Sequence, residues 1–194
     1  RKIYHATKPR WMPMLMTLPK IDADINELLP QIHDTVQNQG LWPEVLSRFS
    51  DIIGARGCII SEIEGIGEAT SIVTPYVCAR YDVAQIQKYL KSYIQYEMLD
   101  QARYELLSKD SDGIDLIDQA TLFGDKIEEF KARPNVQRMH SIGVRERAGG
   151  LLDKDNKRRA RFSIHFGEES AGLTDEVRAL MRSVLPHIAK AIDN

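Results

Sequence analysis

Apolar residues recur at intervals of three and four positions in several segments of the chain, the spacing of helices that bury one face. Over residues 22–39 this spacing predicts a helix that Pro30 kinks or divides in two, because proline removes a backbone hydrogen bond. Over 41–53 it predicts a second helix, with Pro43 in the first turn and Gly54 as a left-handed C-terminal cap.

Further elements are predicted at the start of the chain and in its second half. Residues 8–19 mix prolines with large apolar side chains, which predicts an extended segment lying against the fold. Helical spacing predicts helices over 83–107, over 125–133 up to the next proline, and over 173–192. The last of these begins with Thr174 as N-cap, followed by two acidic residues that the helix dipole favours.

Two pairs of segments have the patterns of strands. Residues 56–63 and 69–77 flank a glycine-bearing turn at 64–68 and predict an antiparallel hairpin. Residues 138–152 and 158–166 predict a second hairpin across 153–157. The last strand alternates, so one face is expected in the core and the other in solvent or a pocket. Its apolar residues are Ala160, Phe162, Ile164 and Phe166, and its polar residues are Arg159, Arg161, Ser163 and His165.

Strand pairs alternate with helices, without the single βα repeats of a parallel sheet. This order predicts an α+β fold with a mainly antiparallel sheet flanked by helices. A chain of 194 residues fits one domain with a helical annex, so we assign 1–39 to an N-terminal extension and helix and 40–194 to the domain. With 43% hydrophobic and 28% charged residues, the composition is that of a soluble globular protein.

Charge, cysteine content and apolar run length exclude several classes of protein. The formal net charge of -2 lacks the basic excess that is typical of nucleic-acid-binding modules. The 2 cysteines are too few for a disulfide framework, which favours a reducing cytoplasm. Every apolar run is far shorter than the ~20 residues of a membrane span, so no membrane association is expected. A first residue other than Met suggests a trimmed fragment.

Patterns that would indicate catalysis or metal binding are weak throughout. No Gly-x-Ser-x-Gly motif occurs, and the 5 histidines show no short metal-ligand spacing. The segment 65–70 fits a hairpin turn better than a phosphate loop, and the acidic run 110–115 lacks the closing glutamate of a calcium loop. We therefore expect no enzymatic activity, no metal and no cofactor.

Two stretches of the sequence resemble a known family. The first is WPEVL at 42–46, followed by IGARGCII at 53–60. The second is RFSIHF at 161–166, followed by LPHIAKAI at 185–192. They are similar to the start and to the closing strand and helix of the sensory domain of LuxR-type transcriptional regulators.

The resemblance implies a PAS- or GAF-like sensor that binds a small molecule or a protein partner. It also implies a helix-turn-helix domain after residue 194, so that DNA would be contacted only through that C-terminal domain. The pocket pattern of acyl-homoserine-lactone receptors is not recognisable over 81–104, so the resemblance identifies no ligand. The alternative function is a stand-alone GAF- or PAS-type binding module.

A pocket for a small, partly apolar effector is expected between the sheet and the central helix and crossover. The reason is that strand alternation puts residues of this kind on one face of the sheet. These candidate ligand-binding residues are Cys58, Ile60, Tyr76, Tyr93, Phe123, His140, Ser163 and His165. The competing interpretation is that the same residues close into a packed core without a cavity.

A homodimer is expected, built partly on the terminal helix and its N-terminal companion. Its apolar stripe is wider than one sheet face requires, and Pro186 should bend the last turns of the helix away from the sheet. The residues expected at the dimer contact are Met181, Leu185, Ile188 and Ile192. In the alternative interpretation, the whole stripe covers the chain's own sheet.

Overall fold

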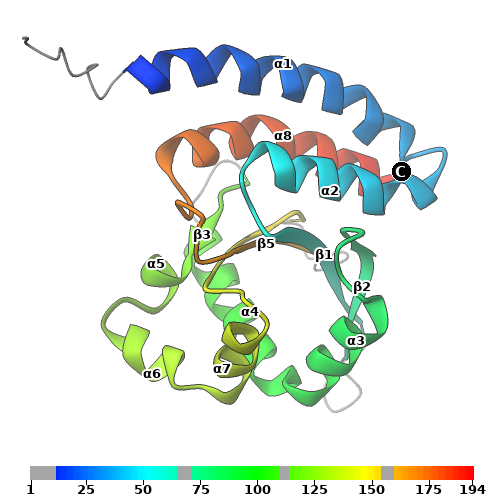
Figure 1. Ribbon diagram of the computed structural model, residues 1–194. Helices are drawn as coiled ribbons and strands as arrows, with labels where there is room; N and C mark the ends of the chain where they lie inside the picture. The colour runs from blue at the N-terminus through cyan, green and yellow to red at the C-terminus, as the bar shows by residue number, and fades with distance from the viewer. Residues whose placement is uncertain (1–11, 65–70, 110–113, 154–159) are drawn as a thin grey trace, which may run out of the picture.

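The computed structural model describes residues 12–64, 71–109, 114–153 and 160–194. Its centre is a five-stranded antiparallel sheet with helices on both faces (Figure 1). The strand order is β2-β1-β5-β4-β3. The strands are β1 (Gly57–Glu64), β2 (Ser71–Val77), β3 (Ile117–Asp118), β4 (Glu146–Leu151) and β5 (Ala160–Phe166). This arrangement confirms the predicted α+β fold.

Both predicted strand pairs are present. β1 pairs antiparallel with β2, and β4 with β5. The predicted turns fall mainly at 65–70 and 154–159, outside the described residues. β4 begins at Glu146 rather than near residue 138, because Val136 and Met139 bury one side of a helix there.

One face of the sheet is covered by three helices. They are α1 (Met12–Asp34), α2 (Trp42–Ile52), which follows the 3-10 turn η1 (Gln39–Leu41), and α8 (Asp175–Asp193). α2 and α8 lie on the sheet, and α1 lies across them (Figure 1). The fully buried side chains of Leu28, Trp42 and Leu185 belong to the same core as Phe162 on β5. The helix predicted over 41–53 and its cap Gly54, at φ 65°, are confirmed.

The first helix is longer and more regular than predicted. Residues 12–19 are helical rather than extended, and α1 runs through Pro30 as one helix instead of two parts. Pro30 is exposed, whereas Leu28 and Ile32 beside it are fully buried. Each buried aliphatic side chain contributes roughly 1.5–3 kcal/mol, so the pair offsets the ~3 kcal/mol that an internal proline costs.

The other face of the sheet is covered by shorter elements. They are α3 (Val83–Ser92), α4 (Ile94–Ser108), α5 (Gln119–Phe123), η3 (Gly124–Lys126), α6 (Ile127–Lys131) and α7 (Pro134–Ser141). The helix predicted over 83–107 is therefore two helices, separated at Tyr93, whose backbone leaves the helical region at φ -125° and ψ 22°. This break lets α3 pack on β2 and α4 on β4. Pro134 not only ends the preceding helical segment but also begins α7.

The terminal helix begins as predicted, because the Thr174 side chain accepts a hydrogen bond from the Val177 backbone N–H. α8 then continues through the exposed Pro186 to Asp193 and does not leave the sheet. The predicted divergence after Pro186 is therefore wrong. Burial of Val184, Leu185 and Ile188 on the sheet side outweighs the lost hydrogen bond.

Candidate functional site

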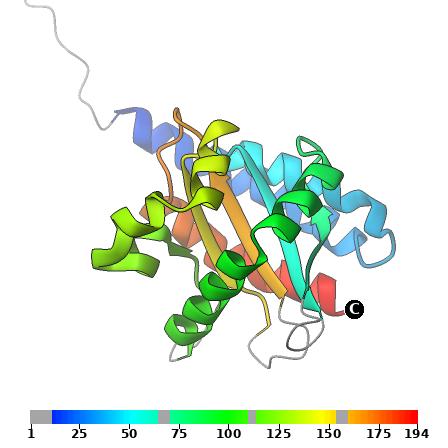
Figure 2. The ribbon, with the colours of Figure 1, turned by 90° about the horizontal axis from the view of Figure 1, so that it is seen from below.

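The central strand β5 is buried on both faces, and its alternation separates two chemical environments. Phe162 and Ile164 point into the core formed with α2 and α8. Arg161, Ser163 and His165 line a small cavity on the opposite face together with residues of α3, α4 and α7, the helices that cover this face of the sheet (Figure 2). These three polar residues are buried, with exposed fractions of 5%, 8% and 2%. The predicted alternation of apolar and polar sides is therefore present from Ala160 to Phe166, whereas Arg159 lies outside the described residues.

A buried network of charges lies on that polar face. Glu97 of α4 accepts hydrogen bonds from Arg147 of β4 at 3.1 Å and from Arg161 at 2.9 Å. Asp100, one turn later, pairs with Arg133 at 2.9 Å and with Arg147 at 3.4 Å. Burial alone would raise the pKa of Glu97, but Arg147 and Arg161 lower it to about 2. Glu97 is therefore a carboxylate at neutral pH.

His165 lies beside the same network. Its Nδ1 atom is 3.0 Å from the Tyr81 hydroxyl. Burial lowers the pKa of His165 to about 3, and the positive charge of Arg147 acts in the same direction. The imidazole is therefore neutral at physiological pH and is part of the polar wall rather than a charged group.

Four buried polar atoms near this network have no hydrogen-bond partner within the described part of the chain. They are Oδ1 and Nδ2 of Asn135, Oε1 of Gln101 and Nε of Arg161. Asn135 is fully buried at the start of α7, beside Tyr89, whose hydroxyl donates to the Asn135 carbonyl at 3.5 Å. Each unpaired group costs about 1–3 kcal/mol, so native proteins contain few of them. Such groups have the chemistry needed to hydrogen-bond a ligand.

A small cavity and a surface groove adjoin this polar face. The cavity, of about 20 Å³, is lined by Arg147, Arg161, Ser163 and His165 and is large enough for roughly one water molecule. The groove has a volume of about 600 Å³, within the range of small-molecule sites. Ile86, Tyr89 and Met139 line both spaces. A rearrangement of these three side chains would join the groove to the buried polar face.

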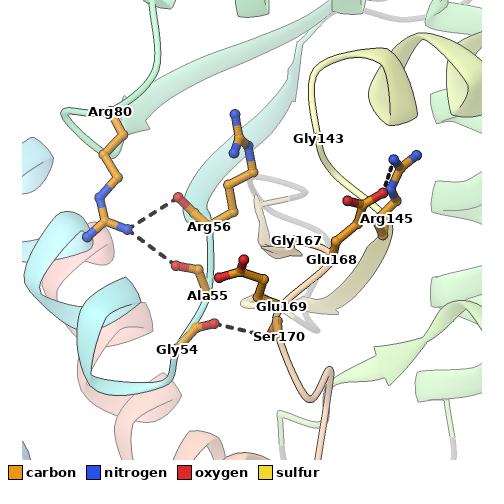
Figure 3. A pocket seen from close by; sticks show the side chains of 10 residues that line it. All are labelled: Gly54, Ala55, Arg56, Arg80, Gly143, Arg145, Gly167, Glu168, Glu169 and Ser170. Atoms are coloured by element: carbon orange, nitrogen blue, oxygen red, sulfur yellow. Dashed lines mark hydrogen bonds and ion pairs between the residues drawn. The ribbon is translucent and has the colours of Figure 1, made fainter.

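A second hollow, of about 520 Å³, lies at the end of the sheet where β1 begins and β5 ends (Figure 3). Its charged side chains mostly pair with one another or with the backbone. Arg145 pairs with Glu168, and Arg80 donates to the carbonyls of Ala55 and Arg56 (Figure 3). We therefore take the groove and the buried polar face behind it as the candidate site.

The eight predicted ligand-binding residues do not form one pocket in the structure. Ser163 and His165 line the cavity, and Tyr93 lines the groove. Phe123 stacks on Phe130 at 3.9 Å in a separate core cluster. His140 is on α7 and lines neither space.

The other three predicted residues are on the opposite side of the sheet. Cys58 and Ile60 are in the core with α2, and Tyr76 contacts Trp42 of that helix at 5.1 Å between ring centroids. The expectation that Cys58 and Ile60 share a face with Ser163 is therefore wrong. Ser163 pairs directly with Ile59, and directly paired residues of antiparallel strands share a face.

The main charged residues of the site were not predicted from the sequence. Glu97 and Asp100 are three positions apart on α4 and are buried, with exposed fractions of 1% and 2%. Two acidic residues at helical spacing usually indicate a solvated face, so the sequence offered no signal for their burial. Arg161 is different, because its place in the alternating strand already put it on the polar face of the sheet.

Other classes of site find no support in the part of the chain that the structure describes. No group of three or more His, Cys, Asp or Glu side chains there could hold a metal ion. Among the described helices, none combines the length and apolar character needed to cross a membrane.

Comparison with solved structures finds the same fold in a ligand-binding domain and in GAF domains. The chain is similar to the ligand-binding domain of VqsR, a LuxR-type regulator from Pseudomonas aeruginosa, with a TM-score of 0.57. That match covers 87% of this chain and 93% of the other, at 12% sequence identity. A phycoerythrobilin-bound GAF domain from a cyanobacterial phytochrome has a TM-score of 0.50, covers 86% and 93% of the two chains, and is 13% identical.

These likenesses establish a GAF-like fold and nothing finer, because the sequence identities are low. No protein-family model and no curated protein matches the chain.

Proposed function

We propose that this chain is the signal-sensing domain of a cytoplasmic LuxR-type transcriptional regulator and that it binds a small molecule on the polar face of its sheet. The observation that carries the proposal is the buried Nε of Arg161, which has no hydrogen-bond partner among the described residues and belongs to a cavity that shares Ile86, Tyr89 and Met139 with a groove of about 600 Å³. The fold shared with the ligand-binding domain of VqsR and the sequence resemblance at the two ends support the same function.

The chemistry of the site favours binding over catalysis. Burial raises the pKa of the Cys58 thiol far above neutrality, and this thiol is on the apolar side of the sheet. His165 is neutral but enclosed, with an exposed fraction of 2%. Neither residue is an accessible nucleophile or base, so we propose a regulatory rather than an enzymatic role.

Thermal unfolding in the presence of fractionated cell metabolites tests ligand binding. A ligand at a hundred times its dissociation constant adds about 2.7 kcal/mol of stability. For a chain of this size that corresponds to a rise in Tm of roughly 5–10 °C. The absence of a shift with every fraction would contradict a small-molecule sensor and favour a protein partner.

Two substitutions locate the binding site. Ile142 lines the groove and is 37% exposed, so Ile142→Trp should obstruct the groove and abolish the Tm shift without unfolding the protein. Leu41 has a similar exposed fraction, 36%, but is on the other side of the molecule. Leu41→Trp should leave the shift unchanged, and equal effects of the two variants would place the ligand elsewhere.

The link to transcription is tested by the parent gene. We expect its reading frame to continue past Asn194 into a helix-turn-helix domain. A reading frame without such a domain would favour the alternative, a stand-alone GAF-type binding module. The fold shared with a phytochrome GAF domain is the observation that keeps this alternative open.

The proposed regulator is a homodimer, because twofold pairing would place two DNA-binding domains on adjacent half-sites. The four residues expected at the contact, Met181, Leu185, Ile188 and Ile192, are buried within one chain, with exposed fractions of 7% or less. They cannot also form a surface contact in this structure, since their side chains are already buried in the core shared with α1, α2 and the sheet. The dimer would have to use other residues.

A further inference from the structure

We infer that the ligand of the groove is a small amphipathic organic anion, with a carboxylate, sulfonate or phosphate group attached to an apolar or aromatic body. This inference rests on the proposed small-molecule function and specifies the chemistry of the molecule that binds. It is carried by the charges and the apolar surfaces that line the groove between α3 and α7 and the polar face behind it.

Three cations of the groove have no acidic partner in the part of the chain that the structure describes. Arg56, Lys88 and Arg138 line it, and none of the three belongs to any ion pair found among residues 12–64, 71–109, 114–153 and 160–194. Arg80, the fourth cation, pairs with Asp51. Unpaired cations around a concave surface attract and hold anions.

The acidic residue that lines the groove is already occupied. Asp82 is the N-cap of α3, and its carboxylate accepts hydrogen bonds from the backbone N–H groups of Ala84 and Gln85. A carboxylate held in this way is not free to neutralise the cations across the groove. An anionic ligand in the groove would therefore lie beside cations that the Asp82 carboxylate does not neutralise.

Positive charge is concentrated at this site although the chain as a whole is acidic. The cations of the site are Arg56, Arg80, Lys88 and Arg138 in the groove and Arg133, Arg147 and Arg161 behind it, and its acids are Asp82, Glu97, Asp100 and the Arg80 partner Asp51. Seven cations and four carboxylates leave a local excess of three positive charges, whereas the chain carries a formal net charge of -2. The net charge of the site is thus positive, whereas that of the whole chain is negative.

The apolar and aromatic residues that line the groove indicate that the rest of the ligand is apolar or aromatic. Ile86, Met139 and Ile142 give the groove an apolar surface, and Tyr89 and Tyr93 add aromatic rings with hydroxyl groups. At the inner end, the Nε atom of Arg161 is buried and has no partner in the described chain. An apolar body would contact the groove, and an acidic or carbonyl oxygen would accept from Arg161 if Tyr89 and Met139 moved aside.

Two dyes with the same ring system test the charge requirement. Anilinonaphthalene sulfonate carries one negative charge, and phenylnaphthylamine is its uncharged counterpart. We expect the sulfonate to bind the intact domain saturably at one site, as measured by dye fluorescence. Lys88→Gln and Arg138→Gln should each raise its Kd by about threefold, as expected for loss of one exposed charge contact. The Kd of phenylnaphthylamine should not change.

Control variants make the result decisive. Lys91 is exposed on α3 but does not line the groove, so Lys91→Gln should leave both dyes unaffected. If Ile142→Trp blocks both dyes but charge removal changes neither Kd, the anion inference is overturned while the small-molecule site stands. If neither dye binds, or if Ile142→Trp affects neither, the groove itself is excluded as the binding site, and the anion inference fails with it.

Discussion

Ionisable side chains on the inner face of β4 and β5 are held in different charge states by their neighbours. Glu97 stays ionised because two arginine side chains hydrogen-bond to its carboxylate. His165, on the same face, stays neutral because burial and the nearby Arg147 disfavour its protonation. Both effects oppose protonation of the folded protein, so acid should destabilise it.

The first prediction concerns His165. An unfolded histidine takes up a proton as the pH falls through 6.5, whereas the folded His165, with a pKa of about 3, does not. The unfolded state therefore binds more protons in this window, and stability is lost as the pH falls. Between pH 7 and pH 5 the free energy of unfolding should decrease by about 2 kcal/mol.

Urea unfolding at the two pH values measures this change. His165→Gln should remove most of the decrease, because the substituted side chain does not titrate. His140→Gln, which removes a partly exposed histidine from α7, is the matched control and should retain the decrease. An unchanged pH dependence in His165→Gln would show that another group is responsible.

A second prediction concerns the centre of the charged network. Glu97→Gln removes the carboxylate shared by Arg147 and Arg161 and leaves two largely buried guanidinium groups short of negative charge. Breaking a buried ion pair on one side typically costs about 3–5 kcal/mol, and we expect a loss of that order in urea unfolding at pH 7. The exposed Glu129→Gln should change stability by less than about 0.5 kcal/mol. Equal effects of the two variants would refute a structural role for the network.

At the scale of elements, two glycines of β4 allow its neighbours to approach closely. A Cβ atom at Gly149 would lie 2.8 Å from the hydroxyl oxygen of Tyr104, which lies under Arg161. At Gly150, a Cβ would lie 2.5 Å from the backbone carbonyl oxygen of Asp115. The close approach of the segment before β3 therefore depends on the missing side chain, and a backbone atom cannot simply rotate away.

The third prediction follows from this contact. Gly150→Ala should force β4 and the segment at residue 115 apart and destabilise the fold by about 1–3 kcal/mol, the usual cost of overpacking. Gly167→Ala is the control, because its Cβ would meet only the Gly143 carbonyl at 3.6 Å, an ordinary contact. Circular dichroism during thermal unfolding measures both. Wild-type stability in Gly150→Ala would contradict the packing described here.

At the scale of the whole molecule, the sheet separates a layer with one large hydrophobic core from a layer in which two smaller hydrophobic clusters accompany buried charges. α1, α2 and α8 share a continuous hydrophobic core with one sheet face, while α3, α4 and α7 enclose charges, unpaired amides and a cavity on the other. The two layers therefore differ in their buried polar groups rather than in whether they contain hydrophobic clusters.

The fourth prediction is the oligomeric state. We expect light scattering at micromolar concentration to give twice the monomer mass of 22.1 kDa. Because Ile188 is 1% exposed within a single chain, Ile188→Glu should unfold the protein rather than separate intact subunits. A mass near 22.1 kDa that persists on concentrating would contradict the dimer.

Hydrophobic spacing by itself determined most elements of the fold and its class. The helix over 41–53, the terminal helix with its Thr174 cap, and the two antiparallel strand pairs were all predictable. Spacing is a reliable signal there because each element buries a single apolar face that its own residues define. For the same reason, the polar side of β5 was recognisable from alternation alone.

Only the tertiary structure decided which faces of the strands and helices pack together and whether a proline interrupts its helix. Pro30 and Pro186 do not break their helices, because burial of neighbouring side chains outweighs the lost hydrogen bonds. The register of β1 against β5 placed Cys58 opposite Ile164 rather than beside Ser163. Glu97 and Asp100 are buried only because Arg133, Arg147 and Arg161, which are distant in the sequence, neutralise them. Such long-range pairings leave no local pattern, so the candidate site emerged only from the folded chain.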